Sequence, residues 1–320
     1  MKQVSLLCGF VLVCSAQAPP NPPTAEEAAR LTALIQSSKR LPWPGMPLAI
    51  QPKVAGWNSD YISSVAAGSK GETYLINRNL GEDAVVVIDA QGKMVRSWGK
   101  GLYTIPHSIR LDPEGNVWTV DSGSSLVLKF TPQGKLLLRI EVGGLPERMK
   151  GRARGTADIG FGPGGRVFVA DGYANARVLE YDATGQLVKQ WGTAGTGPGQ
   201  FNLPHGLVVR DGVIYVADRQ NGRIQRFDLD GKYLGEWGHL GKTFSITAGP
   251  DGNLWIGTHA RNLINEAPGW LVNVDRKTGT VIGFVESPGL HSVDATRKGE
   301  VLSDPGRGNL NQVLWHRQGR

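Results

Sequence analysis

The chain repeats one short pattern six times, and this repeat limits its possible folds more than any other feature. In each copy a glycine turn is followed by β-branched and aromatic residues, as in residues 114–118 and 251–255. Glycine supplies the positive φ of a tight turn, and the residues that follow it favour pleated, half-buried strands. The turn glycines lie 40 to 50 residues apart and are Gly71, Gly115, Gly165, Gly212, Gly252 and Gly299.

A second glycine turn recurs later in most copies and indicates a second hairpin. Three of the strands that follow this turn end in Trp-Gly, at Trp98, Trp191 and Trp237. A spacing of this size suits four short strands per copy, which is the period of one propeller blade. The repeat therefore predicts an all-β fold, a six-bladed β-propeller.

The sixth copy is one strand short, since it ends after residues 312–316. Residues 47–54 precede the first copy and have the character of a strand. An open ring would leave an unpaired edge strand, which natural sheets avoid. We therefore predict that this N-terminal strand closes the ring.

The segments before the propeller have different compositions. Residues 1–18 read as a signal peptide, with an apolar run followed by the small-residue pattern Ala16-Gln17-Ala18. Residues 19–41 are predicted to form an N-terminal helix and linker, and residues 42–320 the propeller. Both cysteines, Cys8 and Cys14, lie in the segment to be removed, so the mature chain would contain no disulfide.

Composition and charge narrow the possible partners. The 320 residues include 44 glycines, and no stretch after the first twenty residues is apolar enough to span a membrane. The net charge is +7, but most basic residues are scattered, which argues against a nucleic-acid-binding stripe. We expect an exported monomer, periplasmic or extracellular, that has no nucleic-acid partner and no membrane segment after signal removal.

Three histidines occur at the same point of every second copy: His107, His205 and His291. A small residue and an aliphatic residue follow each one. The first strand of each propeller blade lines the central channel, and alternate blades are about 120° apart. Three imidazoles that face one point with an open fourth position form the ligand set of a catalytic zinc site. A strand-entry turn without metal is the competing interpretation, which the threefold recurrence disfavours.

A second ring of residues follows about thirteen positions later and is mostly Asp or Asn, as at Asp121 and Asp218. We expect these side chains to bond turn amides. The residues just after them do not recur, and three of them are Arg78, Tyr173 and Arg219. Beside a metal, arginine can hold a carboxylate and tyrosine can exchange a proton. Surface ion pairs and loop packing remain open as alternatives.

Around these residues the chain resembles a known family. The runs DGYANAR at 171–177, GQFNLPH at 199–205 and ADRQNGRIQ at 217–225 are similar to the NHL-repeat propeller of peptidyl-α-hydroxyglycine α-amidating lyase. The resemblance implies zinc ligands at the three histidines and a small-molecule or peptide substrate that carries a carboxylate. It assigns the catalytic roles to Tyr173, Arg78 and Arg219.

The resemblance further implies the reaction and a second metal. The reaction would cleave a peptidyl carbinolamide to a peptide amide and glyoxylate. A structural calcium ion would be held by the backbone carbonyls of Val65 and Ile109. Ser292 stands where the family has an acidic calcium ligand, and Gly289 stands where it has a methionine.

Two other functions stay open at this point. A lactonase-like or esterase-like propeller hydrolase would need carboxylate or Asn ligands for calcium in the channel, and only Asp158 is well placed. A non-catalytic NHL propeller would bind protein or ligand partners with its loops. The combination of three histidines, one tyrosine and two arginines favours the lyase, because a pure scaffold has no reason to retain it.

Overall fold

The structure is a computed structural model that describes residues 24–43, 45–53, 61–143, 155–260, 269–306 and 311–317. The predicted signal peptide at 1–18 lies outside the described residues. Residue 54, the last residue of the predicted closing strand, also lies outside them. Within the described ranges, no helix has the length and apolar character needed to cross a membrane.

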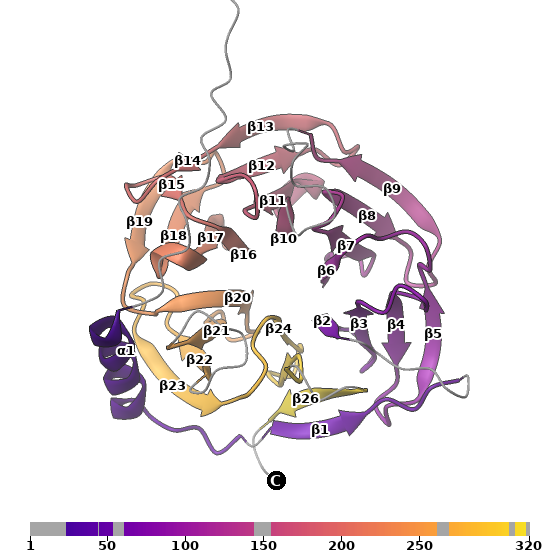
Figure 1. Cartoon of the computed structure of the whole chain (residues 1–320), viewed down its shortest axis with the longest axis horizontal. Helices are drawn as coiled ribbons and strands as arrows, with labels where there is room; N and C mark the ends of the chain where they lie inside the picture. The colour runs from indigo at the N-terminus through magenta and orange to yellow at the C-terminus, as the bar shows by residue number, and fades with distance from the viewer. Residues whose placement is uncertain are drawn as a thin grey trace, which may run out of the picture.

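Six antiparallel sheets of four strands stand around a central axis, as Figure 1 shows. This arrangement confirms the six-bladed β-propeller. The first three blades consist of β2 (Ile62–Ala67), β3 (Thr73–Asn77), β4 (Val85–Ile88) and β5 (Met94–Trp98); β6 (Pro106–Leu111), β7 (Val117–Asp121), β8 (Leu126–Phe130) and β9 (Leu136–Glu141); and β10 (Thr156–Phe161), β11 (Val167–Asp171), β12 (Arg177–Tyr181) and β13 (Leu187–Trp191).

The other three blades follow the same order from the axis outwards. They consist of β16 (Pro204–Arg210), β17 (Val213–Asp218), β18 (Arg223–Asp228) and β19 (Tyr233–Trp237); β20 (Lys242–Ala248), β21 (Leu254–His259), β22 (Gly269–Val274) and β23 (Val281–Glu286); and β24 (Val293–Ala295), β25 (Val301–Ser303), β26 (Gln312–His316) and β1 (Gly45–Ala49). A short parallel pair, β14 (Thr193–Ala194) and β15 (Gln200–Phe201), leads from the third blade into the fourth.

The ring is closed by the N-terminal strand, as predicted. β1 pairs antiparallel with β26 and becomes the outermost strand of the sixth blade. The strand spans Gly45–Ala49 rather than 47–54. After it, Ile50 is buried and Gln51 forms a bridge with Lys93 of the first blade. The segment therefore ties the sixth blade to the first.

The core lies between the faces of neighbouring blades. Strands near the axis, such as β3 and β7, are buried along their whole length, whereas outermost strands such as β9 and β13 are largely exposed. One cluster joins Trp118 and Val120 of the second blade to Ile159 and Val169 of the third. Such apolar contacts supply most of the stability of a fold without disulfides.

The outer hairpin glycines and the Trp-Gly strand ends form one contact between blades. A Cβ atom at Gly134 would lie 2.7 Å from the ring of Trp98 in the preceding blade. The same close approach joins Gly231 to Trp191 and Gly279 to Trp237. Each of these glycines has positive φ. Two features that recur separately in the sequence are therefore the two halves of one packing interaction.

The predicted N-terminal helix is α1 (Ala25–Ser37), and it begins at a capping box formed by Thr24 and Glu27. Leu31 and Ile35 are buried in a cluster that includes Phe284 of β23. Figure 1 shows the helix against the outer edge of the fifth blade. The helix thus covers apolar surface that β23 would otherwise expose.

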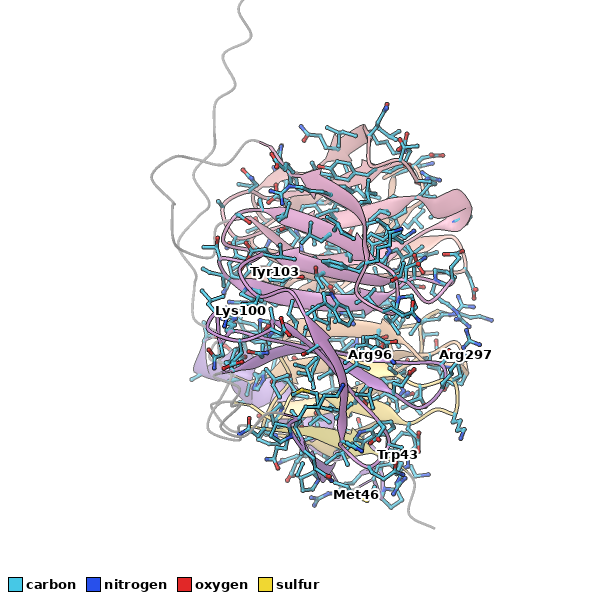
Figure 2. The ribbon with its side chains drawn as sticks, turned by 90° about the vertical axis from the view of Figure 1, so that its right-hand side faces the viewer. Trp43, Met46, Arg96, Lys100, Tyr103 and Arg297 are labelled. Carbon is cyan, nitrogen blue, oxygen red and sulfur yellow. The ribbon has the colours of Figure 1, made fainter. Side chains whose placement is uncertain are left out.

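The two faces of the ring carry different sets of loops. Innermost strands begin at one face, which we call the entry face; Tyr103, just before β6, lies toward it in Figure 2. Arg297 lies on the opposite face. The loops that follow the second strand of each blade also reach the entry face, so the entry face gathers residues that are far apart in the sequence.

Deleting Gly45–Ala49 is expected to give insoluble protein, because β26 would become an unpaired edge. Solubility after expression and the cooperativity of thermal unfolding are the measurements. Soluble protein that unfolds in one sharp transition would contradict this role of β1.

His316 makes the closing blade sensitive to acid. The side chain is fully buried and bonds Ser303 Oγ through Nε2 at 3.0 Å. Burial lowers the pKa of His316 to about 4. The unfolded chain, with a histidine pKa of about 6.5, therefore binds this proton more tightly than the folded chain. Stability is fully present above pH about 6.5 and is lost as the pH falls towards 4.

The matched variant is His316→Gln, which removes the proton-binding group. From pH 7 to 4.5 the free energy of unfolding of wild type should fall by about 2 kcal/mol more than that of His316→Gln. Denaturant unfolding at both pH values measures the difference. Equal losses in the two proteins would show that His316 does not titrate in this way.

Candidate metal centre

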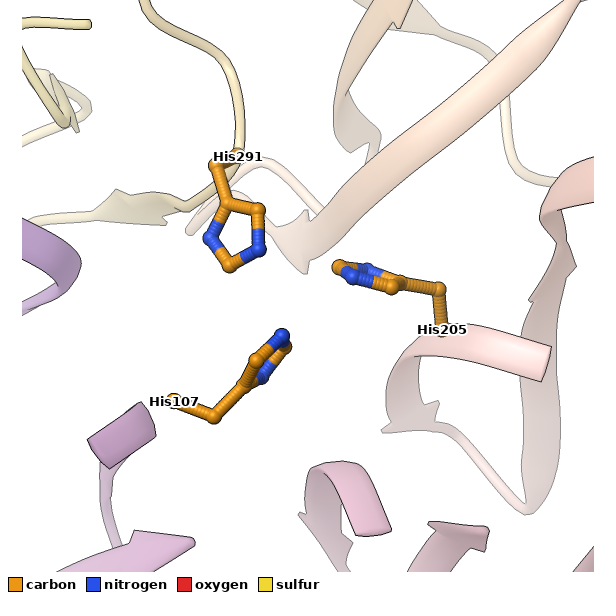
Figure 3. A group of neighbouring side chains, drawn as sticks. All are labelled: His107, His205 and His291. Carbon is orange, nitrogen blue, oxygen red and sulfur yellow. The ribbon is translucent and has the colours of Figure 1, made fainter. Parts of the chain in front are cut away.

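Three histidines meet at the axis on the entry-face side, as Figure 3 shows. His107 lies in β6, His205 lies in β16, and His291 lies two residues before β24. All three side chains are buried, and their available ring nitrogens lie within 4.8 Å of one another. The ring closure that the repeat predicts therefore brings together residues that are about one hundred positions apart along the chain.

A β-bulge turns the first two imidazoles toward the axis. In the second blade Pro106 pairs with Asp121 and Ser108 pairs with Val120, so His107 is an extra residue. The pairing of β16 is interrupted at the same place, between Pro204 and Leu207. A bulge re-aims a side chain that regular pleating would point into the space between blades. The direction of these two imidazoles therefore depends on a local irregularity of the strand.

The bulge also corrects the equivalences expected for the other blades. The sequence pattern places Ser63, Asp158 and Ser245 at the position of the histidines. Ser63 does occupy it, but register shifts put Ala157 and Phe244 there in the third and fifth blades. Asp158 and Ser245 lie one residue later. Their expected placement was wrong because the histidine lies 13 residues before the second ring in the fourth and sixth blades but 14 before it in the second, and the third and fifth blades follow the longer spacing.

The blades between the histidines orient the imidazoles. Each Nδ1 lies 2.6 to 2.7 Å from a backbone carbonyl oxygen, which can only accept a hydrogen bond. Nδ1 therefore carries the proton, and Nε2 is the acceptor nitrogen of each ring. Metal-binding histidines show this arrangement. The carbonyls belong to the bulge residues of the next blade, in the order Ala157, Phe244 and Ser63.

Burial keeps the imidazoles of His107 and His205 neutral. Removal from water holds the pKa of His107 and of His205 well below the ordinary range. Interaction with the other histidines lowers the pKa of His107 further, and interaction with Arg219 lowers that of His205. Buried imidazoles with a fixed tautomer and converging ring nitrogens fit a metal ion, so the three histidines can bind one.

Tyr173 reaches the same centre from the loop after β11. Its hydroxyl oxygen lies 2.8 Å from His107 Nε2 and 2.9 Å from His205 Nε2. Its backbone N–H donates to the carbonyl of Gly155 at 3.0 Å. Gly172 makes this path possible, because a Cβ there would lie 2.0 Å from the carbonyl oxygen of Pro204. The loop thus holds the phenol beside the Nε2 atoms of His107 and His205.

Arg78 and Arg219 occupy the corresponding loops of the first and fourth blades. Arg78 Nε donates to the carbonyl of Pro106 at 3.0 Å, and its guanidinium lies 5.0 Å from the ring centre of Tyr61. Arg219 lies 4.4 Å from the ring centre of Phe244, and burial lowers its pKa. Among the described residues, neither arginine forms an ion pair with a carboxylate. Within that part of the chain, a carbonyl and two aromatic rings hold them instead of the surface ion pair considered from sequence.

Carboxylates of the second ring fix the turns that lead into the histidine strands. Asp121 accepts a hydrogen bond from the backbone N–H of Ile105, and Asp218 accepts one from that of Asn202. Asp304 accepts one from the N–H of Ser292 at 2.9 Å. These bonds match the role that the sequence predicts for the ring.

The proposed calcium ligands Val65 and Ile109 lie deeper along the axis, on β2 and β6. Their backbone N–H groups donate to Ser292 Oγ and Ser64 Oγ, each at 3.1 Å. Arg110 also reaches into this region. Its guanidinium donates to carbonyls of the innermost strands at the level of Val65, and a divalent cation beside that positive charge would be repelled. The residues present do not fit calcium.

Four residues in or beside the centre were not identified from the sequence: Phe244, Tyr61, Ala157 and Arg110. The carbonyl of Phe244 accepts a hydrogen bond from His205 Nδ1, and the ring of Phe244 packs against the guanidinium of Arg219. The ring of Tyr61 packs against the guanidinium of Arg78 in the same way. Alignment of the repeats on the 14-residue spacing between His107 and Asp121 would have placed Phe244 and Ala157. Arg110 gives no such signal, because its partners come from other blades.

The fold and the histidine centre define the protein as a six-bladed β-propeller that can hold a metal ion on its axis. Comparison with known proteins agrees, since a family described as a 6-bladed beta-propeller matches residues 161–286. The fold is also that of the solved streptogramin B lyase, with a TM-score of 0.59 at 13% identity over 87% of this chain and 98% of that one.

Curated relatives then specify the homology. The chain is 33% identical over 218 residues to the peptidylglycine alpha-amidating monooxygenase of Rattus norvegicus. The aligned region covers 61% of this chain and 22% of that protein. It is 32% identical over 159 residues to the probable peptidyl-alpha-hydroxyglycine alpha-amidating lyase pgal-1 of Caenorhabditis elegans. Here the aligned region covers 47% of this chain and 45% of that protein. The chain is thus a propeller homologous to the peptidyl-α-hydroxyglycine α-amidating lyases, and it spans less than half of either relative.

Metal analysis tests the centre directly. Purified wild type should contain about one metal ion per chain, and His205→Ala should lose most of it because two imidazoles remain. His239, an exposed histidine that bonds the carbonyl of Gly279, is the matched control. His239→Ala should keep its metal. Equal metal content in wild type and His205→Ala would show that the ion binds elsewhere.

Proposed function

We propose that this protein is a zinc-dependent lyase that cleaves a peptidyl-α-hydroxyglycine-type carbinolamide to an amide and glyoxylate. The observation that supports it best is the convergence of one phenol and two guanidinium groups on three buried, oriented imidazoles. A scaffold that only bound partners would not need this combination. The homology to amidating lyases points to the same reaction class.

His107, His205 and His291 would hold the zinc ion through Nε2. A bound zinc ion acts as a Lewis acid that lowers the pKa of a hydroxyl group placed on it. The tautomer of each imidazole is set by a backbone carbonyl, so each ring already presents Nε2 as the nitrogen that would bind the metal. Zinc suits this set because it accepts three nitrogen ligands and leaves a fourth position open.

Tyr173 is the group placed to move the proton. Its hydroxyl lies within hydrogen-bond distance of two ligand nitrogens, so it borders the open position. As a phenolate it would take the proton of the substrate hydroxyl, whose carbon then becomes the aldehyde carbon of glyoxylate. The C–N bond breaks, its electron pair stays on nitrogen, and the same proton returns to give the neutral amide.

The two arginines would bind the substrate carboxylate and stabilise the phenolate. Arg219 lies against Tyr173, which places a positive charge beside the phenol. Lys242 adds a third cation near Arg219; burial, together with Arg219, lowers the pKa of Lys242 to about 8. An anionic substrate relieves the repulsion among these positive groups, which is why a carboxylate is the expected handle.

The test uses α-hydroxyhippurate as substrate and measures glyoxylate release. Wild type should release glyoxylate, and Tyr173→Phe should lower kcat by about a hundredfold to ten thousandfold, because only the proton-transfer group is lost. Metal content should not change. Tyr233→Phe is the matched control, since that hydroxyl bonds Glu236 in the outermost strand of its blade.

The lyase assignment would be wrong if wild type released glyoxylate no faster than Tyr173→Phe. An equal loss in Tyr233→Phe would indicate that the variants act through stability instead of chemistry.

A further inference from the structure

We infer that Arg110 and Asp158, which we call the axial ion pair, act as positioning residues that hold the three metal-binding histidines in place. The inference rests on the proposed metal centre and extends it to residues that cannot touch the substrate. The axial ion pair lies below the imidazoles, away from the entry face. Asp158 forms hydrogen bonds with the strands that follow His107 and His205, and Arg110 forms one with the strand that follows His291.

The two side chains form a bidentate pair. Arg110 Nε lies 3.0 Å from Asp158 Oδ1, and Arg110 Nη2 lies 2.6 Å from Asp158 Oδ2. Only 10% of the arginine side chain and 6% of the aspartate side chain are exposed. A planar guanidinium and a carboxylate in this arrangement fix each other in direction as well as distance.

Asp158 connects the pair to the first two histidines. Its Oδ1 accepts a hydrogen bond from Ser108 Oγ at 2.5 Å, and Ser108 directly follows His107. Its Oδ2 accepts one from the backbone N–H of Leu207 at 3.3 Å, two residues after His205. One carboxylate therefore bonds the strand segments that come just after both bulges.

Arg110 connects the pair to the third histidine. Its Nη1 donates to the carbonyl of Val293 at 2.9 Å, two residues after His291. Its Nη2 also lies 3.5 Å from the carbonyl of Ile246, two residues after Phe244, whose own carbonyl orients His205. The guanidinium thus joins the fifth and sixth blades to the carboxylate of the third.

The position of this guanidinium suggests that it replaces a bound cation. Val293 and Ile246 occupy the same place in their blades as Val65 and Ile109, the carbonyls expected to bind calcium. The cavity under the histidines has a volume of about 10 Å³, which is room for one water-sized body. A positive charge supplied by the chain itself bonds carbonyls there without any ion from solution.

A positioning role can be separated from a purely structural one. Removing one member of a buried ion pair leaves an unpaired charge and destabilises the fold, whereas neutralising both members is often tolerated. The test therefore compares Arg110→Met with the double variant Arg110→Met/Asp158→Asn. Thermal unfolding reports the fold, and titration with Co²⁺ reports the metal centre through its affinity and its visible absorption spectrum.

Arg110→Met should unfold at a clearly lower temperature, and the double variant should regain most of that loss. The double variant should still bind Co²⁺ about tenfold to a hundredfold more weakly than wild type, with an altered spectrum, because the histidine strands are no longer held together. Arg166→Met/Glu180→Gln is the matched control, since it removes another partly buried pair far from the axis, with a distance of 2.6 Å. It should leave the Co²⁺ affinity unchanged.

Two results would overturn the positioning role: a double variant with wild-type affinity and spectrum, or an equal loss of affinity in the control. Wild type that binds no Co²⁺ would overturn the metal centre together with this inference. Wild type that binds Co²⁺ but releases no glyoxylate would overturn only the lyase assignment. Finally, the unfolding temperature of wild type should not respond to CaCl₂. A rise that Asp158→Asn abolishes would show that calcium enters beside the guanidinium, against the inference.

Discussion

The extra residue near the start of the innermost strands is the constraint on which the centre depends. In a regular strand the side chain after Pro106 would alternate with its neighbours and point between blades. The bulge turns His107 to the axis and, in the next blade, turns the carbonyl of Ala157 toward the ring nitrogen of His107. One irregularity, repeated around the ring, thus supplies both the ligands and the acceptors that orient them.

Alternation between blades gives the centre an approximate threefold order. Even-numbered blades contribute imidazoles, and odd-numbered blades contribute the carbonyls of Ser63, Ala157 and Phe244. The loop residues Arg78, Tyr173 and Arg219 do not follow this order, because they come from the first, third and fourth blades. A symmetric histidine centre inside an asymmetric ring of loops suits the single bound substrate of the proposed reaction.

Much of this could be predicted from the sequence because the repeat is periodic and the histidines share one phase of it. The glycine spacing was sufficient to predict the number of blades. The incomplete sixth copy was sufficient to predict that the N-terminal segment closes the ring. The ends of that strand were wrong, since residues 50–53 have strand composition but continue toward the first blade as a bridge at Gln51. Register at the axis was wrong by one residue in two blades, because the number of residues between the axis and the second ring differs by one between blades.

Arg110 shows why the remainder could not be predicted. In the sequence it is an arginine in a buried strand, where a repeat analysis expects a small or apolar side chain. Its partners are a carboxylate 48 positions away and carbonyls 136 and 183 positions away, and a carbonyl has no sequence signature. A buried charge of this kind costs free energy unless every donor finds an acceptor. Because the guanidinium finds a carboxylate and two carbonyls on three other blades, the closed ring must form before Arg110 is satisfied, which couples the geometry of the metal centre to completion of the fold.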